Sequence, residues 1–286
     1  MLSQSLVFII WDFDPRIYTL AIFGGEWPIA WYGLLFAASF LGGQLVMRYI
    51  YKRDRKPVAD LEILMLYVVL ATVIGARLGH YLFYEWELLV AQPGRWLTSM
   101  LSLPFEGLAS HGATIVIPVA LYLYSRKRSD QPFLWVVDRL VIAVSLGGAL
   151  IRLGNLLNSE IYGKPTTLPW GFVFVRETDP ALLPLVPRHP TQLYESLFCL
   201  FLLALTFALW KQKRYRLPNG FITGIFLILL FGFRFLVEFL KTSQEDFENS
   251  MVLNMGQILS IPAILVGVII LLVIRRQNRP VLTVNC

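Results

Sequence analysis

The stretch LWVVDRLVIAVSLGGALIRLGNLL, residues 134–157, decides the fold. As a helix it would extend about 36 Å, which is enough to cross the roughly 30 Å hydrocarbon core of a bilayer. Six more apolar stretches show the same pattern, at residues 28–50, 61–84, 107–124, 191–210, 220–240 and 256–274. The sequence therefore predicts an all-α integral membrane protein with seven transmembrane helices.

The composition agrees with a membrane location. Of the 286 residues, 56% are hydrophobic and 15% are charged, and the mean hydropathy is +0.62. A soluble domain carries about 25% charged residues, so this composition excludes a disordered chain and most soluble enzymes. Two cysteines are too few for a disulfide scaffold. No linker or repeat interrupts residues 1–286, which we interpret as a single membrane-embedded domain.

The basic residues predict the orientation. They gather after spans one, three, five and seven, at residues 48–56, 126–128, 211–216 and 275–279. Cytoplasmic loops carry an excess of lysine and arginine, so these loops are expected to be cytoplasmic. The N-terminus is then outside and the C-terminus inside. The net charge of +6 is spread over short clusters and forms no basic face, so the lipid bilayer is the expected partner and nucleic acid is not.

Several polar side chains fall within the predicted spans. Counting about 1.5 Å per residue from the outer ends places them in the outer third of the bilayer, on six different helices. Charges at this depth are costly and mark functional sites. The residues are Tyr32, Arg77, His111, Arg152, Glu195 and Arg234, with Asp138 and Arg139 as an exception near the cytoplasmic start of span four, interpreted as a local interfacial pair.

Local spacing supports a shared pocket. Arg234 and Glu238 are separated by four residues, and Gln192 and Glu195 by three, so each pair lies on one helix face. Arg152, Asn155 and Asn158 follow one stripe and lead into Glu160 and Gly163. Two plainer interpretations stay open: that Asn158, Glu160 and Gly163 only terminate the span, and that residues 188–195 are an ordinary helix start.

The sequence predicts no metal site and no cofactor. Its three histidines, His80, His111 and His189, are far apart and lack the spacing of metal-binding motifs.

Several blocks together resemble the prolipoprotein diacylglyceryl transferase family. The strongest is residues 152–163, RLGNLLNSEIYG; the others, in the family's order, are Trp31-Tyr-Gly33, Gly75-Ala-Arg-Leu-Gly79, Ser110-His-Gly112, residues 188–195, 233–238 and 255–260. The resemblance implies transfer of a diacylglyceryl group from phosphatidylglycerol to the lipobox cysteine of a prolipoprotein signal peptide, with formation of a thioether and release of glycerol phosphate. It also implies a bacterial cytoplasmic (inner) membrane, with the active site toward the outer leaflet.

The resemblance and the chemistry together suggest residue roles. His111 is the predicted general base, because histidine titrates near neutral pH, although an arginine-assisted environment is an open alternative for deprotonating the thiol. Arg234 and Glu238 complete the predicted catalytic set, with arginine suited to phosphate. The predicted phosphatidylglycerol-binding residues are Tyr32, Arg77, Arg152, Asn155, Asn158, Glu160, Gly163, Gln192 and Glu195.

Two positions depart from the family pattern, and one loop is long. Relatives commonly have Arg where this chain has Ala30, and some have Tyr where it has Leu230. By resemblance, residues 159–189 form a small periplasmic head that guides the prolipoprotein; an ordered lid is the alternative. Residues 171–175 within the loop are strand-like.

Two other classes of protein compete with a transferase. A transporter or channel for an organic anion would also need buried arginines, but its site usually lies near the bilayer midplane. A structural scaffold would leave the buried charges without a use.

Overall fold

The computed structural model describes residues 8–22, 25–102, 107, 109–176, 184–213, 216–242 and 251–277. The chain divides into two compact units. The first unit comprises Met1–Val46 and Asp138–Cys286, and the second comprises Met47–Val137.

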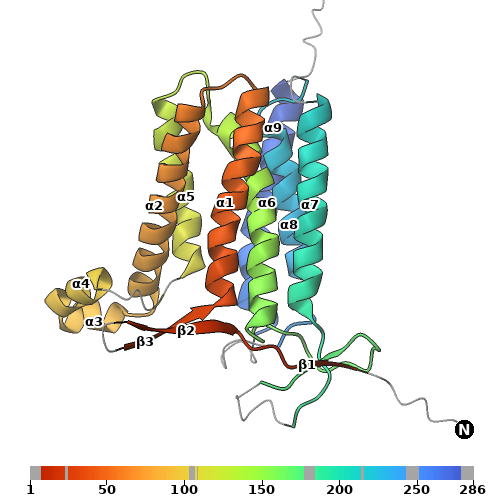
Figure 1. The fold of residues 1–286 in the computed structure, drawn as a ribbon. Helices are drawn as coiled ribbons and strands as arrows, with labels where there is room; N and C mark the ends of the chain where they lie inside the picture. Colours follow the sequence, from red (N-terminus) through yellow and green to blue (C-terminus); the bar gives the residue numbers. More distant parts are fainter. Residues whose placement is uncertain are drawn as a thin grey trace, which may run out of the picture. The chain divides into compact units, whose positions relative to one another are not determined.

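The first unit is built from long helices (Figure 1). Gly148 on one helix lies against Cys199 on the next, and the Ser196 hydroxyl donates a hydrogen bond of 2.9 Å to the Ala149 carbonyl. Small residues that allow close backbone approach are typical of helix packing in membranes. The helices are α1 (Trp31–Arg53), which begins in this unit, α6 (Phe133–Leu157), most of which lies in it, α7 (Thr191–Lys213), α8 (Phe221–Glu238) and α9 (Met255–Gln277).

Asp138 closes the start of α8. Its carboxylate is buried and accepts hydrogen bonds from the backbone N–H groups of Gly220 and Thr223 and from the Thr223 hydroxyl, at 2.6–2.8 Å. A negative charge at a helix N-terminus satisfies otherwise unpaired donors and complements the helix dipole. Asp138 is therefore not the local feature that the sequence suggests, because its hydrogen-bond partners lie at the start of another helix. Its position at the membrane interface stays a prediction.

The first unit includes a small folded segment that we call the head; it comprises β1 and the described part of residues 159–189. Strand β1 (Ile9–Trp11) pairs in parallel with β4 (Phe172–Phe174), which confirms the predicted strand at residues 171–175. Phe172 and Phe174 pack with Tyr162 and Leu156, and Trp11 joins this cluster by donating a hydrogen bond of 3.0 Å to the Leu156 carbonyl. Residues 177–183 of the predicted head lie outside the described residues.

The N-terminal part of the chain forms a β-hairpin that the sequence did not predict. Strands β2 (Arg16–Ile22) and β3 (Gly25–Ala30) are antiparallel. Helix α1 begins at Trp31, three residues after the approximate predicted start of span one, because Pro28 lies in β3, opposite Thr19. An edge strand tolerates a proline, which has no N–H to donate. The expected all-α fold thus carries four short strands among the described residues.

The second unit is also helical. Its helices are α2 (Val58–Phe83), α3 (Trp86–Ala91), α4 (Pro93–Leu101) and α5 (Ser110–Arg126). Gly79 lies so close to α5 that an added Cβ would be 2.6 Å from the Cα of Gly112, and Gly75 is similarly crowded. Such close approach at small residues is typical of helix packing in membranes. The short helices α3 and α4 were not predicted.

Among the residues that the structure describes, six helices are long and apolar enough to cross a membrane: α1, α2, α6, α7, α8 and α9. They match predicted spans within a few residues, which supports a multi-pass membrane protein. Helix α5, in the place of predicted span three, has 17 residues and is not among the six. The seventh span stays a prediction.

Candidate active site

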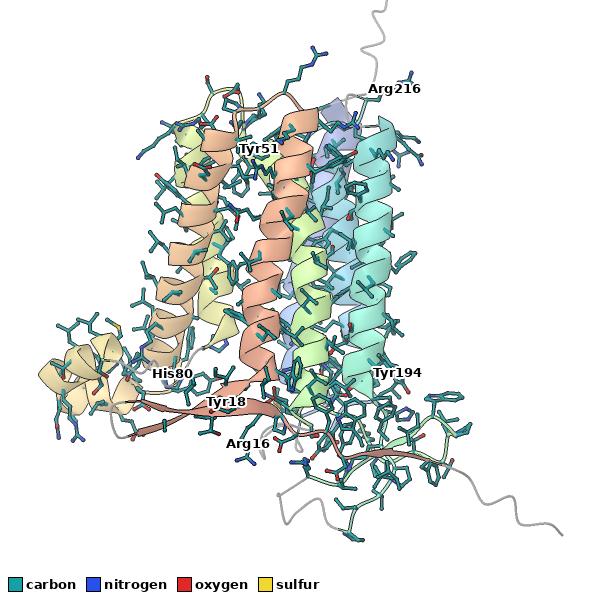
Figure 2. The ribbon with its side chains drawn as sticks, in the orientation of Figure 1. Arg16, Tyr18, Tyr51, His80, Tyr194 and Arg216 are labelled. Carbon is teal, nitrogen blue, oxygen red and sulfur yellow. The ribbon has the colours of Figure 1, made fainter. Side chains whose placement is uncertain are left out.

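The predicted site residues on α6, α7 and α8 of the first unit gather at one end of these helices. This end comprises the last turns of α6 and α8 and the first turns of α7 and α9. Figure 2 shows Tyr194 at this end of α7 and Arg216 beyond the opposite end. The arginine-rich and lysine-rich ends of α7 and α9 thus lie away from the polar end.

Five charged side chains at this end form one network, which we call the charged cluster: Arg152, Glu195, Arg234, Glu238 and Lys241. Arg152 Nε lies 2.9 Å from Glu195 Oε2, and Arg234 Nε lies 3.6 Å from Glu238 Oε1. Lys241 Nζ joins the two pairs, at 3.0 Å from Glu195 Oε1 and 2.9 Å from Glu238 Oε1. Three cations and two carboxylates give the cluster a net charge of +1. A positive, largely buried cluster of this kind can hold a phosphate.

Lys241 was not among the predicted site residues. It directly follows the predicted span at residues 220–240, yet its side chain is 2% exposed and lies between two carboxylates. One signal was present, because Lys241 follows Glu238 by three residues and such neighbours meet on a helix face.

Glu238 is also held from the start of α9. Asn254 Nδ2 lies 3.2 Å from Glu238 Oε2, and a Cβ added to Gly256 would lie 2.5 Å from the same carboxylate group. Asn254 and Gln257 exchange side-chain and backbone hydrogen bonds in a capping box, at 2.8 and 3.1 Å. An Asn three residues before a Gln at the start of an apolar run is a helix-start signal that sequence reasoning missed.

A tight turn after α6 brings the signature amides together. Asn155 and Asn158 both donate to Glu160 Oε1, at 2.8 and 3.3 Å, and Asn155 accepts from Arg152 at 3.1 Å. The flanking residues Ser159 and Ile161 have φ angles of 55° and 59°. A left-handed conformation is costly for a β-branched residue such as Ile161.

Helix α7 holds this strained turn in place. Gln192 Nε2 donates to the Glu160 carbonyl at 2.6 Å, and the Thr191 hydroxyl donates to the Ile161 carbonyl at 2.9 Å. Among the described residues, Gln192 Oε1 and Asn158 Oδ1 are buried acceptors without a hydrogen-bond partner. Hydroxyl groups of a ligand would satisfy them. The interpretation that this turn only terminates a span leaves these contacts unexplained.

Gly163 connects the head to the charged cluster. It forms an antiparallel bridge with Lys241, and its N–H donates to the His189 carbonyl at 2.8 Å. A Cβ there would lie 2.6 Å from His189 Cβ and 2.7 Å from the Leu240 carbonyl oxygen, so a side chain does not fit. His189 Nδ1 lies 3.2 Å from the Tyr194 hydroxyl, and burial lowers the pKa of His189.

Tyr32, in the first turn of α1, lies against α6. A Cβ added to Gly154 would be 2.8 Å from the Tyr32 ring. Gly154 lies between Arg152 and Asn155 in the sequence, so the aromatic ring packs beside the signature residues. The predicted contact of Tyr32 with the lipid headgroup requires this position beside the signature residues.

The second unit carries the other two predicted residues. His111 is in the first turn of α5, half-buried, with its ring 5.0 Å from that of Phe83 and 5.8 Å from that of Tyr84. Arg77 is buried and donates to backbone carbonyls at the end of α4, namely Ser99 and Met100 at 2.8 Å each. These contacts indicate that Arg77 anchors α4, because a cation is favourable at a helix C-terminus. Its predicted contact with phosphatidylglycerol stays a prediction.

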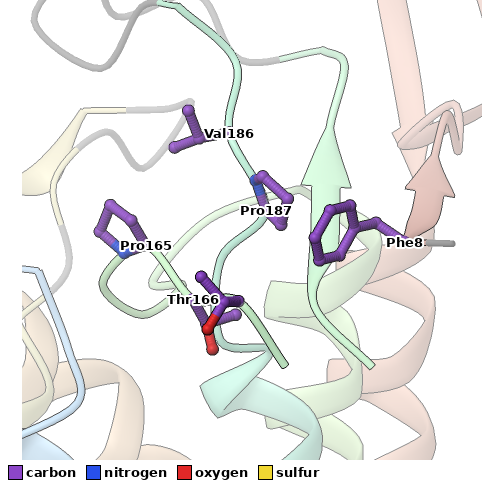
Figure 3. A pocket seen from close by; sticks show the side chains of 6 residues that line it. Phe8, Pro165, Thr166, Val186 and Pro187 are labelled. Atoms are coloured by element: carbon purple, nitrogen blue, oxygen red, sulfur yellow. The ribbon is translucent and has the colours of Figure 1, made fainter. Parts of the chain in front are cut away.

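A pocket of about 500 Å³ lies in the head (Figure 3). It is open and is lined by Phe8, Pro165, Thr166, Thr167, Val186 and Pro187. None of the predicted site residues lines it, so the charged cluster and this pocket are separate features.

The comparisons with known proteins point to one family. A family described as "Prolipoprotein diacylglyceryl transferase" matches residues 19–273. A phosphatidylglycerol–prolipoprotein diacylglyceryl transferase of Porphyromonas gingivalis is 44% identical, with 96% of each chain covered. Proteins of the same name from Chloroherpeton thalassium and Tolumonas auensis are 42% and 40% identical, covering 92% and 94% of this chain and 93% and 99% of their own. These matches confirm the resemblance carried by the sequence blocks, and the chain belongs to the prolipoprotein diacylglyceryl transferase family.

Proposed function

We propose that this protein transfers the diacylglyceryl group of phosphatidylglycerol to the thiol of a lipobox cysteine in a prolipoprotein signal peptide. The observation that carries the proposal is the charged cluster beside the signature amides, in a chain of this family. A transporter or channel for an organic anion is not favoured, because the relatives are named as transferases and their similarity covers more than nine-tenths of this chain.

The phosphate of the lipid would bind at the charged cluster. Arg152 and Arg234 can each donate two parallel hydrogen bonds to phosphate oxygens. Glu195 and Glu238 hold these arginines through the ion pairs described above. The headgroup glycerol would donate its hydroxyls to Asn158 and Gln192, whose side-chain oxygens lack partners among the described residues.

Around this core, the proposal gives the remaining residues supporting roles. Asn155 and Glu160 shape the turn that presents the amides, and Gly163 keeps the head close to it. Tyr32 would contact the headgroup from α1.

The reaction exchanges one bond for another. The thiolate attacks the diacylglyceryl carbon, the bond between that carbon and the phosphate-ester oxygen breaks, and a carbon–sulfur bond forms. Glycerol phosphate leaves with the electron pair, and charge that develops on its oxygens is stabilised by the arginines. The proposal assigns the thiol proton to His111, because imidazole is suited to general-base catalysis near neutral pH.

The proposal places this chemistry at the outer leaflet of the bacterial inner membrane. It takes α5 as the seventh span, residues 159–189 as a periplasmic head and the whole chain as one transferase domain. The supporting observation within the first unit is that the charged cluster lies at the helix ends opposite Lys211, Lys213, Arg275 and Arg276, since basic ends are typically cytoplasmic.

The test is a transfer assay with purified protein, phosphatidylglycerol and a lipobox peptide, analysed by intact-mass spectrometry. We expect a peptide carrying one diacylglyceryl group on its cysteine, and none on a peptide with serine in that place. No product under conditions in which the Porphyromonas gingivalis relative works would reject the proposal. Arg152→Ala and His111→Ala should each lower turnover strongly in folded protein; full rates for both would reject the residue roles alone.

A further inference from the structure

Lys241 occupies the centre of the charged cluster, between the carboxylates of two helices. Its side chain is 2% exposed, and Glu195 and Glu238 are each 7% exposed. The backbone of Lys241 is fixed as well, by its bridge to Gly163 and by the hydrogen bond of 2.7 Å from the Lys164 N–H to the Leu240 carbonyl. A lysine buried this deeply needs both partners, because an unpaired buried charge is strongly destabilising.

The lysine determines how much of each carboxylate is left for the arginines. On Glu195 it takes Oε1, which leaves Oε2 for Arg152. On Glu238 it contacts Oε1 at 2.9 Å, whereas Arg234 approaches the same oxygen only to 3.6 Å. Arg234 is also the most exposed member, with 38% of its side chain accessible, and its Nε has no hydrogen-bond partner among the described residues. Arg234 is therefore paired loosely and has donors to offer.

The charge balance gives Lys241 a second effect. Without it, two arginines face two carboxylates and their formal charges cancel. With it, the cluster carries one positive charge. A phosphate diester is a monoanion, and the departing monoester gains further negative charge, so the interaction with this excess cation strengthens as the carbon–oxygen bond breaks.

We propose that Lys241 is a positioning residue that holds Glu195 and Glu238 and thereby keeps Arg152 and Arg234 available for the phosphate. This inference rests on the proposed function, since it concerns how the same site binds its lipid. Removal of the ammonium would draw both carboxylates fully onto the arginines. The donors would then be occupied, and the anionic lipid would meet a cluster without net charge.

The test compares K241M and K241R with the matched control K164M, whose exposed lysine lies on the opposite side of the Gly163–Lys241 bridge. Transfer to a lipobox peptide is followed at varied phosphatidylglycerol, and thermal unfolding is recorded for each variant. We expect kcat/KM of K241M to fall about 100-fold with a raised KM for the lipid, the loss that misplaced binding groups produce. K241R should keep kcat/KM within about threefold because it retains the charge, and K164M should match the wild type.

A double variant keeps the inference testable if K241M does not fold. In E195Q/K241M the cluster again has one more cation than carboxylates, because two arginines then face one carboxylate. We therefore expect the double variant to fold and to retain measurable transfer to the lipobox peptide. Wild-type kinetics for K241M would overturn the inference. A K241R variant as impaired as K241M with an unchanged unfolding temperature, or a folded double variant without transfer activity, would overturn it as well. If the wild type itself forms no product, the proposed function fails instead.

Discussion

Replacing Gly163 by alanine tests how the head and the charged cluster are connected. The new Cβ would lie 2.6 Å from His189 Cβ, 2.7 Å from the Leu240 carbonyl oxygen and 2.9 Å from the His189 carbonyl oxygen. Ordinary carbon contacts are about 3.5–4.0 Å, so the two flanking segments must separate by about 1 Å. Both close oxygens belong to the backbone, which cannot rotate away as a flexible side chain would.

The displacement acts on the residue next to Leu240, which is Lys241. We expect Gly163→Ala to lower the free energy of unfolding by about 1–3 kcal/mol, as overpacking does, and to lower the transfer rate about 100-fold because a shift of 1 Å misplaces the cluster. The assay pairs thermal unfolding with peptide lipidation. Gly232→Ala is the matched control: an added Cβ there meets nothing within 4 Å, and alanine favours a helix. A Gly163→Ala protein with the transfer rate and unfolding temperature of the wild type would show that the contacts of Gly163 do not position the charged cluster.

Three other predictions concern stability. Asp138→Ala removes the acceptor for Gly220 and Thr223 at the start of α8, so the free energy of unfolding should fall by about 1–2 kcal/mol; a thermal midpoint equal to that of the wild type contradicts this role. Arg77→Met should increase hydrogen exchange at the end of α4, and Arg77→Lys should not restore protection, because one ammonium cannot match the spread of guanidinium donors. Burial lowers the pKa of His189 from its usual value of 6.5, so the folded head disfavours the protonated histidine. The stability of the head, measured by hydrogen exchange, should therefore decline as the pH falls through 6.5, and His189→Gln should make this decline less steep.

The spans could be predicted from the sequence because length and apolarity are local properties. The stretch at residues 134–157 became α6 with a shift of one residue at its start. Helices α3 and α4 were missed, since each is too short for a periodic pattern, and α4 depends on Arg77 for its C-terminal end. The β2–β3 hairpin was missed, and residues 28–30 at the end of β3 were included in the predicted span because they directly precede α1.

The site could be predicted in part for the same reason. Spacing along one helix indicated the pairs within α6, α7 and α8, and the structure brings these residues of the first unit together. It could not show that Lys241 joins Glu195, which lies 46 residues earlier in the chain, or that Asp138 closes α8. Such contacts depend on which helices are neighbours, and that information is tertiary. The signature Gly163 likewise gained an explanation only from its distance to His189 and Leu240.

Arg152 and Arg234 should bind the phosphate of phosphatidylglycerol directly. Solid-state NMR can measure this contact, through dipolar dephasing between the lipid ³¹P and ¹⁵N-labelled arginine side chains in reconstituted protein. A hydrogen-bonded guanidinium nitrogen lies about 4 Å from phosphorus, so we predict strong dephasing that decreases in Arg152→Lys and in Arg234→Lys and persists in Arg216→Lys. Dephasing that is unchanged in both cluster variants would contradict the account.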